Sequence, residues 1–200
     1  MNITCDVSIG ELVDKLTILH IKLNNIKDEN KLNDIKKEYD ILNLKIIDIK
    51  DKINFYYNLL MLINMDIWDS MDKIRLIDEE QNIKEWVSEC KKTIIDNDRR
   101  FRIKNKINNI MNSLLKEQKG YNLKEAIYYD TNIDTNLFIA QVRYLSTLYD
   151  MVTVYSNNTQ CMQYFSDDNM IKVIITNKVN DNTNQYNWPS NINEYYYNAN

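Results

Sequence analysis

The chain has 200 residues, an apolar fraction of 44% and a formal net charge of −4. This length allows one large domain or two small ones, each with a buried core. A single histidine, His20, and three widely separated cysteines argue against a Cys/His zinc site or a histidine-based triad, and we expect no metal and no cofactor. No stretch is apolar enough to span a bilayer, and cysteine usage without a signal-peptide pattern predicts a cytoplasmic protein.

The first predicted helix begins at Ser8. Ser8 and Glu11 have the spacing of a capping box, in which the serine hydroxyl accepts from the backbone N–H of Glu11 and the glutamate reaches back. Apolar residues then recur at steps of three and four, at Leu12, Leu16, Leu19, Leu23 and Ile26. This period predicts a helix with one apolar face that ends at the polar segment KDEN.

A longer apolar repeat covers residues 32–67. It runs through Leu32, Ile35, Tyr39, Leu42, Ile46, Ile49, Ile53, Tyr56, Leu60, Ile63 and Ile67. The repeat predicts one long helix that pairs with the first as an antiparallel hairpin with a coiled-coil-like seam. Ile41, Leu44 and Ile47 lie beside this seam, so we expect a third helical layer, from residues 80–118, to cover them.

The predicted third layer carries two apolar stripes. They are Ile83, Trp86, Val87, Cys90 and Ile94, and then Ile103, Ile107, Ile110 and Leu114, with Gly120 as the expected stop. Residues 91–106 of the same segment are rich in basic side chains, which could contact nucleic acid. Asp96 and Asp98 lie among them without interleaved aromatic residues, so we favour a solvated face or a face that pairs with the acidic first half.

The composition changes in the second half of the chain, where short apolar runs appear. The runs AIYY, MVTVY and IKVIIT are rich in β-branched and aromatic residues and alternate with helical segments, which predicts a parallel β-α-β-α-β unit. Asn and Tyr dominate the last part, which we expect to be disordered, with docking of Trp188 and Tyr195–Tyr197 as the alternative.

The predicted fold class is therefore α+β, with an antiparallel helical hairpin and a third helix before a small parallel sheet. The expected parts are a helical coiled-coil-like domain at 1–120, a truncated Rossmann-like unit at 121–176 and a tail at 177–200.

Four blocks in the first half carry a resemblance to a known family. They are SIGELVDKLTILHIKL, KLNDIKKEYDIL, IWDSMDKIR, and NDRRFRIKNKIN followed by LLKEQKGY. Over residues 4–121 they resemble an uncharacterised helical domain family of bacteria and giant viruses, often near or fused to polysaccharide-synthesis proteins. The resemblance implies a helical fold and a glycan-synthesis context, in the host cytoplasm or the virion if the protein is viral, but no reaction.

The polar positions that recur in that family correspond here to Glu11, Asp14, Lys15, Lys22, Arg75, Asn97, Asp98 and Arg100. Two interpretations compete. In the one we favour, these side chains form hydrogen bonds and ion pairs that hold the helices in register. In the other, Arg75, Arg100 and the N-terminus of the first helix, beside Gly10, hold an anion such as phosphate.

The second half carries a resemblance of its own. AQVRYLSTLYDMVTVYS and the later YFSDDNMIKVI are similar to the start of GT-B glycosyltransferase-like proteins, over residues 126–175. In those relatives the turn after the first strand is glycine-rich, whereas here it reads DTNIDTN. We therefore expect this turn not to bind a nucleotide sugar, and Arg143 in the next helix to point into water.

Together these features predict a non-catalytic interaction or assembly module in a glycan-synthesis context, derived from a glycosyltransferase-like fusion. It would contact a protein partner or a second copy through helical faces, with no catalytic residues. The alternative is a sugar-nucleotide-dependent glycosyltransferase, or a subunit of one that a partner chain completes. A nucleic-acid-binding protein that uses residues 91–106 is a weaker third candidate.

Overall fold

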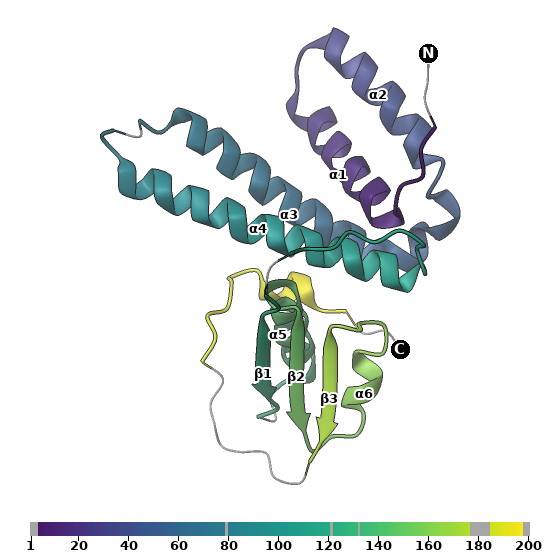
Figure 1. Cartoon of the computed structure of the whole chain (residues 1–200), viewed down its shortest axis with the longest axis vertical. Helices are drawn as coiled ribbons and strands as arrows, with labels where there is room; N and C mark the ends of the chain where they lie inside the picture. Colours follow the sequence, from purple (N-terminus) through teal and green to yellow (C-terminus); the bar gives the residue numbers. More distant parts are fainter. Residues whose placement is uncertain (1–3, 79, 121, 132, 177–184, 198–200) are drawn as a thin grey trace. The chain divides into compact units, whose positions relative to one another are not determined.

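A computed structural model describes residues 4–78, 80–120, 122–131, 133–176 and 185–197 (Figure 1). The chain divides into two compact units, Met1–Glu117 and Gln118–Asn200, so the boundary falls just before Gly120. The fold is 61% helical, and a small three-stranded parallel sheet follows the helices. The predicted mixed class, with helices first and a parallel sheet after them, is confirmed.

The first unit is helical. Its elements are α1 (Ile9–Asn25), α2 (Glu29–Asn43), the 3-10 helix η1 (Ile47–Ile49), α3 (Lys50–Leu76) and α4 (Ile83–Ile110). The two long helices α3 and α4 run side by side, and α1 packs against both of them and against α2 (Figure 1). The fully buried core includes Val13, Leu16, Leu60, Ile63, Ile103 and Ile107. Within the described residues, no helix has both the length and the apolarity needed to cross a bilayer.

The predicted single helix over 32–67 is wrong, because residues 44–49 form turns and η1 between α2 and α3. Ile46 in this turn and Ile53 at the start of α3 are fully buried, whereas α2 has no fully buried residue. A straight helix would carry Ile46 and Ile53 away from α1 and α4 along the line of α2. Burial of these side chains therefore outweighs the intrahelical hydrogen bonds that are lost at the turn.

The expected third layer over Ile41, Leu44 and Ile47 is also wrong. These side chains are 53%, 68% and 61% exposed. The predicted layer exists as α4, but α4 packs on α3 and α1. Once the chain turns after α2, the residues beside the expected seam no longer face the rest of the unit.

Helix α4 ends earlier than Gly120. Asn112 adopts a left-handed backbone conformation with φ 50°, and the Ser113 N–H donates to the Asn108 carbonyl at 2.8 Å. This is a Schellman motif, in which asparagine takes the place usually held by glycine. Of the predicted stripe residues, the fully buried ones are Ile103 and Ile107, and the exposed ones are Ile83, Ile94 and Leu114.

The second unit contains the parallel sheet. Its elements are β1 (Glu125–Tyr129), α5 (Thr135–Leu148), β2 (Met151–Ser156), α6 (Cys161–Tyr164) and β3 (Ile171–Ile175). The strand order is β1-β2-β3, and Val154 pairs with Tyr128 on one side and with Val173 on the other. The alternating burial of β2 points Val152 and Val154 into a core shared with α5.

The end of the chain packs on this unit over residues 185–197. The Trp188 ring lies 6.3 Å from Tyr128 and 6.2 Å from Tyr144, and Tyr195 is buried 5.0 Å from Tyr144. For these residues the structure follows the docked alternative and not the expected disorder. The remainder of the expected disordered tail, 177–184 and 198–200, lies outside the described residues.

Candidate functional site

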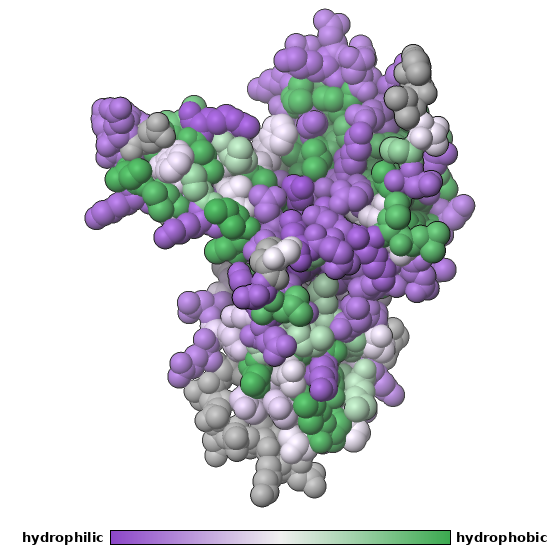
Figure 2. All heavy atoms as spheres, viewed as in Figure 1, coloured by the Kyte–Doolittle hydropathy of each residue, from purple (hydrophilic) through white to green (hydrophobic). Residues whose placement is uncertain are grey.

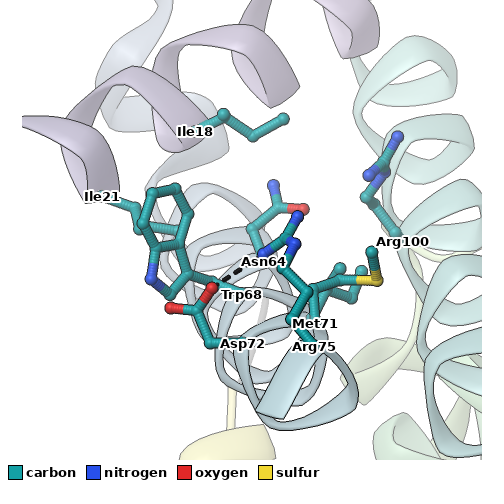
Figure 3. Close-up of a pocket in the computed structure, with 9 residues that line it drawn as sticks. Ile18, Ile21, Asn64, Trp68, Met71, Asp72, Arg75 and Arg100 are labelled. Atoms are coloured by element: carbon teal, nitrogen blue, oxygen red, sulfur yellow. Dashed lines mark hydrogen bonds and ion pairs between the residues drawn. The ribbon is translucent and has the colours of Figure 1, made fainter. Parts of the chain in front are cut away.

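A pocket of about 240 Å³ opens between α1, α3 and α4. Asn64, Trp68, Met71 and Arg75 follow one another at steps of four, three and four, which places them on one face of α3. Figure 3 shows that Arg100 reaches the same pocket from α4, while Ile18 and Ile21 close it from α1. The pocket therefore combines apolar walls with two guanidinium groups from two different helices.

The polar side of the pocket rests on a buried network. Asn64 donates through Nδ2 to Asp14 Oδ1 at 2.9 Å and to Thr17 Oγ1 at 2.8 Å. Thr17 Oγ1 in turn donates to the Asp14 carbonyl at 2.8 Å, and Arg100 Nε lies 3.5 Å from Asp14 Oδ1. Asp14, Thr17 and Asn64 are all buried, so this network joins α1, α3 and α4 within the unit.

Burial controls the charge of Asp14. It raises the pKa of this carboxyl above the ordinary value of 3.8, although Arg100 and the hydrogen bond from Asn64 pull in the opposite direction. Removing a carboxylate from water disfavours its ionised form, and one ion pair at 3.5 Å recovers only part of that cost. Asp14 therefore serves as an acceptor that fixes its neighbours.

Arg75 stands at the rim of the pocket. Its Nη1 pairs with Asp72 Oδ1 at 2.8 Å, one turn earlier on α3, and both side chains are more than half exposed (Figure 3). An exposed ion pair of this kind contributes about 0.2–1 kcal/mol to the free energy of unfolding. Arg75 is thus held in place only loosely.

The N-terminus of α1 does not belong to this pocket. Its N–H groups already donate to side chains: Ile9 to Ser113 Oγ, Gly10 to Asn108 Oδ1 at 2.7 Å, and Glu11 to Ser8 Oγ at 3.2 Å. The predicted Ser8 cap is confirmed. The alternative of an anion held beside Gly10 is not supported, because the N–H groups of Ile9, Gly10 and Glu11 already have side-chain acceptors. Gly10 instead allows close packing, since a Cβ there would lie 2.5 Å from the Lys104 carbonyl.

Two basic residues of 91–106, Arg99 and Lys104, are buried in ion pairs. Lys104 Nζ contacts Glu11 at 2.5 Å and Glu117 at 2.8 Å. Burial opposes the charge, but these hydrogen bonds outweigh it and raise the pKa of Lys104. Arg99 is buried against Asp96 at 2.8 Å, where burial raises the pKa of the Asp96 carboxyl despite the arginine. The predicted pairing with acidic groups of the first half is confirmed for Lys104, which is therefore not a phosphate contact.

The remaining predicted site residues lie elsewhere. Lys15 pairs with Glu38 at 2.6 Å across α1 and α2, on the surface. Asn97 is exposed and donates to the Thr93 carbonyl of its own helix, and Asp98 is half-buried on α4. Lys22 sits in the last turn of α1. The structure thus joins Asp14 to Arg100 and brings Arg100 and Arg75 to one pocket, but it does not assemble the whole set.

Sequence reasoning missed the polar residues Thr17, Asn64 and Asp72 and the aromatic Trp68, as well as the apolar walls of the pocket. Asn64 interrupts an apolar run, and a lone polar residue on an otherwise buried helix face signals a buried hydrogen bond. Trp68, Asp72 and Arg75 lie on one face at helical spacing, which was readable from the block IWDSMDKIR. That Arg100 joins them depends on how α4 packs on α3, which no local pattern encodes.

A second cluster lies at the carboxyl ends of β1 and β2. Ser156 Oγ donates to Asp130 Oδ2 at 2.6 Å, and the Cys161 thiol lies 3.1 Å from Ser156 Oγ. Burial raises the pKa of Cys161, so its thiol is held protonated. Asp134 caps α5 by accepting the N–H groups of Asn136 and Leu137. The polar groups at this edge of the sheet therefore form hydrogen bonds with one another. Within the described residues, no group of three His, Cys, Asp or Glu side chains is placed to hold a metal.

Arg143 does not point into water, so that expectation is wrong. Its guanidinium is buried and pairs with Asp167 at 2.6 Å, while Nε donates to the Tyr197 carbonyl and Nη2 to the Tyr164 carbonyl, both at 2.8 Å. Helix α5 is covered by the chain end, which supplies acceptors that make burial of the charge tolerable. Arg143 thus fastens residues 185–197 to the second unit.

The arrangement defines a two-part α+β protein, in which a helical unit with a charged pocket precedes a small parallel sheet. Residues 3–133 match a protein family described as "Family of unknown function (DUF6165)", and the chain belongs to this family. The matched stretch includes α1 to α4, β1 and part of the turn after β1. No curated protein and no solved structure matched the chain.

Proposed function

We propose that the chain is a non-catalytic interaction module, which assembles with a second copy or another protein chain in a cytoplasmic glycan-synthesis context. The context rests on two resemblances: residues 4–121 resemble an uncharacterised helical family often near or fused to polysaccharide-synthesis proteins, and residues 126–175 resemble the start of GT-B glycosyltransferase-like proteins. The interaction role rests on the surface of the helical unit.

The observation that carries the interaction role is the apolar surface where α2 leads into η1. Ile41, Leu44 and Ile47 are each more than half exposed there, and α2 has no fully buried residue of its own. Figure 2 shows hydrophobic side chains gathered at this end of the helical unit. Ile41 and Leu44 are three residues apart and share a face. Grouped exposed apolar side chains are typical of protein-contact surfaces, and isolated ones are not.

The turn after β1 supports a non-catalytic role for the second unit. A diphosphate needs free backbone N–H groups or basic side chains. Here Asp134 already accepts the first N–H groups of α5, and Asp130 is bonded to Ser156. Two carboxylates in this turn would also repel a diphosphate.

A glycosyltransferase, or a subunit of one, is the second candidate, and one observation favours it. A hollow of about 200 Å³ lies beside Asp130, Thr135 and Asn158 at the carboxyl ends of β1 and β2. Parallel α/β proteins bind nucleotides at this edge. Within the described residues its lining includes no lysine or arginine, which is why we rank this function second.

Sedimentation velocity over a range of protein concentrations tests the interaction role. We expect the wild type to self-associate, and a triple variant with Ile41→Ser, Leu44→Ser and Ile47→Ser to stay monomeric. Because these side chains are exposed, the variant should keep the helical circular dichroism of the wild type. A matched control, Ile94→Ser on α4, removes an equally exposed isoleucine outside this surface and should leave association unchanged. A wild type that stays monomeric at every concentration would contradict self-association through this surface.

A further inference from the structure

We propose that the pocket between α1, α3 and α4 binds a small organic oxyanion, a carboxylate or a phosphate ester with an apolar body, held by Arg75 and Arg100. The pocket residues are distinct from Ile41, Leu44 and Ile47. Ligand binding at this pocket and self-association through those three residues can therefore be tested separately.

The positive charge comes from two arginines with donors to spare. Within the described residues, Arg100 has Asp14 as its ion-pair partner through Nε, and Arg75 has Asp72 through Nη1. The terminal nitrogens of Arg100 and the Nη2 of Arg75 are left for another acceptor. A guanidinium presents its N–H groups in a planar fork that matches carboxylate and phosphate oxygens.

The buried network gives the site a fixed base. Asp14 and Asn64 are both buried and bonded to each other, and Asp14 holds the Nε side of Arg100. Arg100 is therefore partly oriented before a ligand arrives, which lowers the entropy lost on binding. Arg75 is more exposed, and within the described residues its ion pair is the surface one with Asp72, so it is less firmly oriented than Arg100.

The apolar walls decide what kind of anion fits. Ile18, Ile21, Trp68 and Met71 line the same space as the two arginines (Figure 3). An inorganic ion would leave these walls in contact with water, whereas a ligand with a planar or aliphatic body would cover them. At about 240 Å³ the pocket is smaller than the roughly 300–1,000 Å³ of sites for drug-sized ligands, so the ligand is small.

The ion pair between Asp72 and Arg75 allows a test in which a substitution should strengthen ligand binding. Its carboxylate occupies Arg75 in the free protein, and a ligand oxyanion would compete for the same guanidinium. Removal of the Asp72 charge should therefore strengthen binding. A purely structural Asp72–Arg75 pair predicts no effect on any ligand.

Titration calorimetry of the full chain with three anionic probes tests the site. Phenyl phosphate and benzoate each carry an oxyanion on a planar apolar body, inorganic phosphate lacks the body, and benzyl alcohol lacks the charge. We expect saturable binding of phenyl phosphate, benzoate or both, with at least about tenfold weaker binding of inorganic phosphate and benzyl alcohol. The tighter of the two aromatic anions identifies the ligand class as phosphate ester or carboxylate.

Four variants connect the binding to the pocket. Arg75→Gln and Arg100→Gln should each weaken it about tenfold or more, and Asp72→Asn should strengthen it several-fold. Lys73→Gln is the matched control, because Lys73 is an exposed cation on the same turn of α3 that does not line the pocket. Arg75 is exposed, so Arg75→Gln keeps the test valid even if Arg100→Gln unfolds the unit. No binding of either aromatic anion at millimolar concentration, or equal binding by Arg75→Gln and wild type, would overturn the proposal.

Discussion

Asn64 on α3 donates one amide nitrogen to both Asp14 and Thr17 on α1, at 2.9 and 2.8 Å. These acceptors lie 50 and 47 residues away along the chain, so a single side chain fixes how two helices are aligned. The same aspartate contacts Arg100 on α4. A fully satisfied buried network of this kind specifies one packing arrangement where apolar contacts alone would allow several.

Asn64→Ala should therefore lower the free energy of unfolding by about 1–3 kcal/mol, because the Asp14 carboxylate and Thr17 lose a buried donor. Urea unfolding followed by helical circular dichroism measures the change. Asn97→Ala is the matched control, since Asn97 is exposed and bonds only within its own helix, and its effect should stay within about 0.5 kcal/mol. Equal stability of Asn64→Ala and wild type would show that the network does not hold the helices together.

The close approach of α1 and α4 at Gly10 gives a second prediction. A Cβ at Gly10 would meet the Lys104 carbonyl at 2.5 Å, and a backbone atom cannot turn away as a side chain can. Gly10→Ala should destabilise the helical unit by about 1–3 kcal/mol in a thermal melt. Gly120→Ala is the control, because no atom lies within 4 Å of its Cβ position. Equal melting of the two variants would contradict the packing of α1 on α4.

The raised pKa of Asp14 predicts a pH dependence with a definite sign. The folded protein holds this proton more tightly than the unfolded chain, whose carboxyl titrates near 3.8. The resulting stabilisation is complete below that value and is lost as the pH rises through the higher folded pKa. Relative to Asp14→Asn, which does not titrate, the wild type should lose stability as the pH rises above about 4. Parallel stability profiles of the two proteins would show that burial does not shift this group.

Arg143 provides a prediction for the second unit. Arg143→Ala leaves Asp167 and the carbonyls of Tyr164 and Tyr197 without their buried donor. The segment 185–197 should then detach from α5 and become sensitive to limited proteolysis, while the helical unit melts as before. Arg143→Lys should restore little of the proteolytic resistance, because an ammonium group cannot replace the planar guanidinium that contacts Asp167 and two backbone carbonyls. Proteolytic resistance equal to that of wild type would contradict the role of Arg143.

Patterns of neighbouring residues predicted those parts of the fold that depend on interactions within one helix or strand. The Ser8 cap, helical periodicity in α1 and α4, and the order of three β-rich runs were all readable from neighbouring residues. The break between α2 and α3 was not, because the apolar repeat continues through Ile46, with the apolar Leu44 beside it, and no glycine or proline interrupts it. Which of these two side chains is buried depends on α1 and α4, so tertiary packing overrides the repeat.

The candidate site could likewise be predicted only in part, because its partners come from distant parts of the chain. Arg75 and Arg100 were identified as residues that could meet an anion, but their nearest expected partner, the N-terminus of α1, is closed by Ser8, Asn108 and Ser113. Asn108 lies near the end of α4 and Ser113 just after it, about a hundred residues away along the chain. Arg143 was misplaced for a similar reason, since its acceptors come from α6, the following loop and the chain end.

The proposed non-catalytic role requires that the second unit does not bind a sugar nucleotide. Titration calorimetry of the full chain with uridine, guanosine and thymidine diphosphate sugars measures this. We predict no saturable heat at millimolar concentration, because Asp130 and Asp134 sit at the turn after β1 and the first N–H groups of α5 are occupied. Micromolar binding that is lost on Asn158→Ala, at the carboxyl end of β2, would contradict the non-catalytic role and place the glycosyltransferase function first.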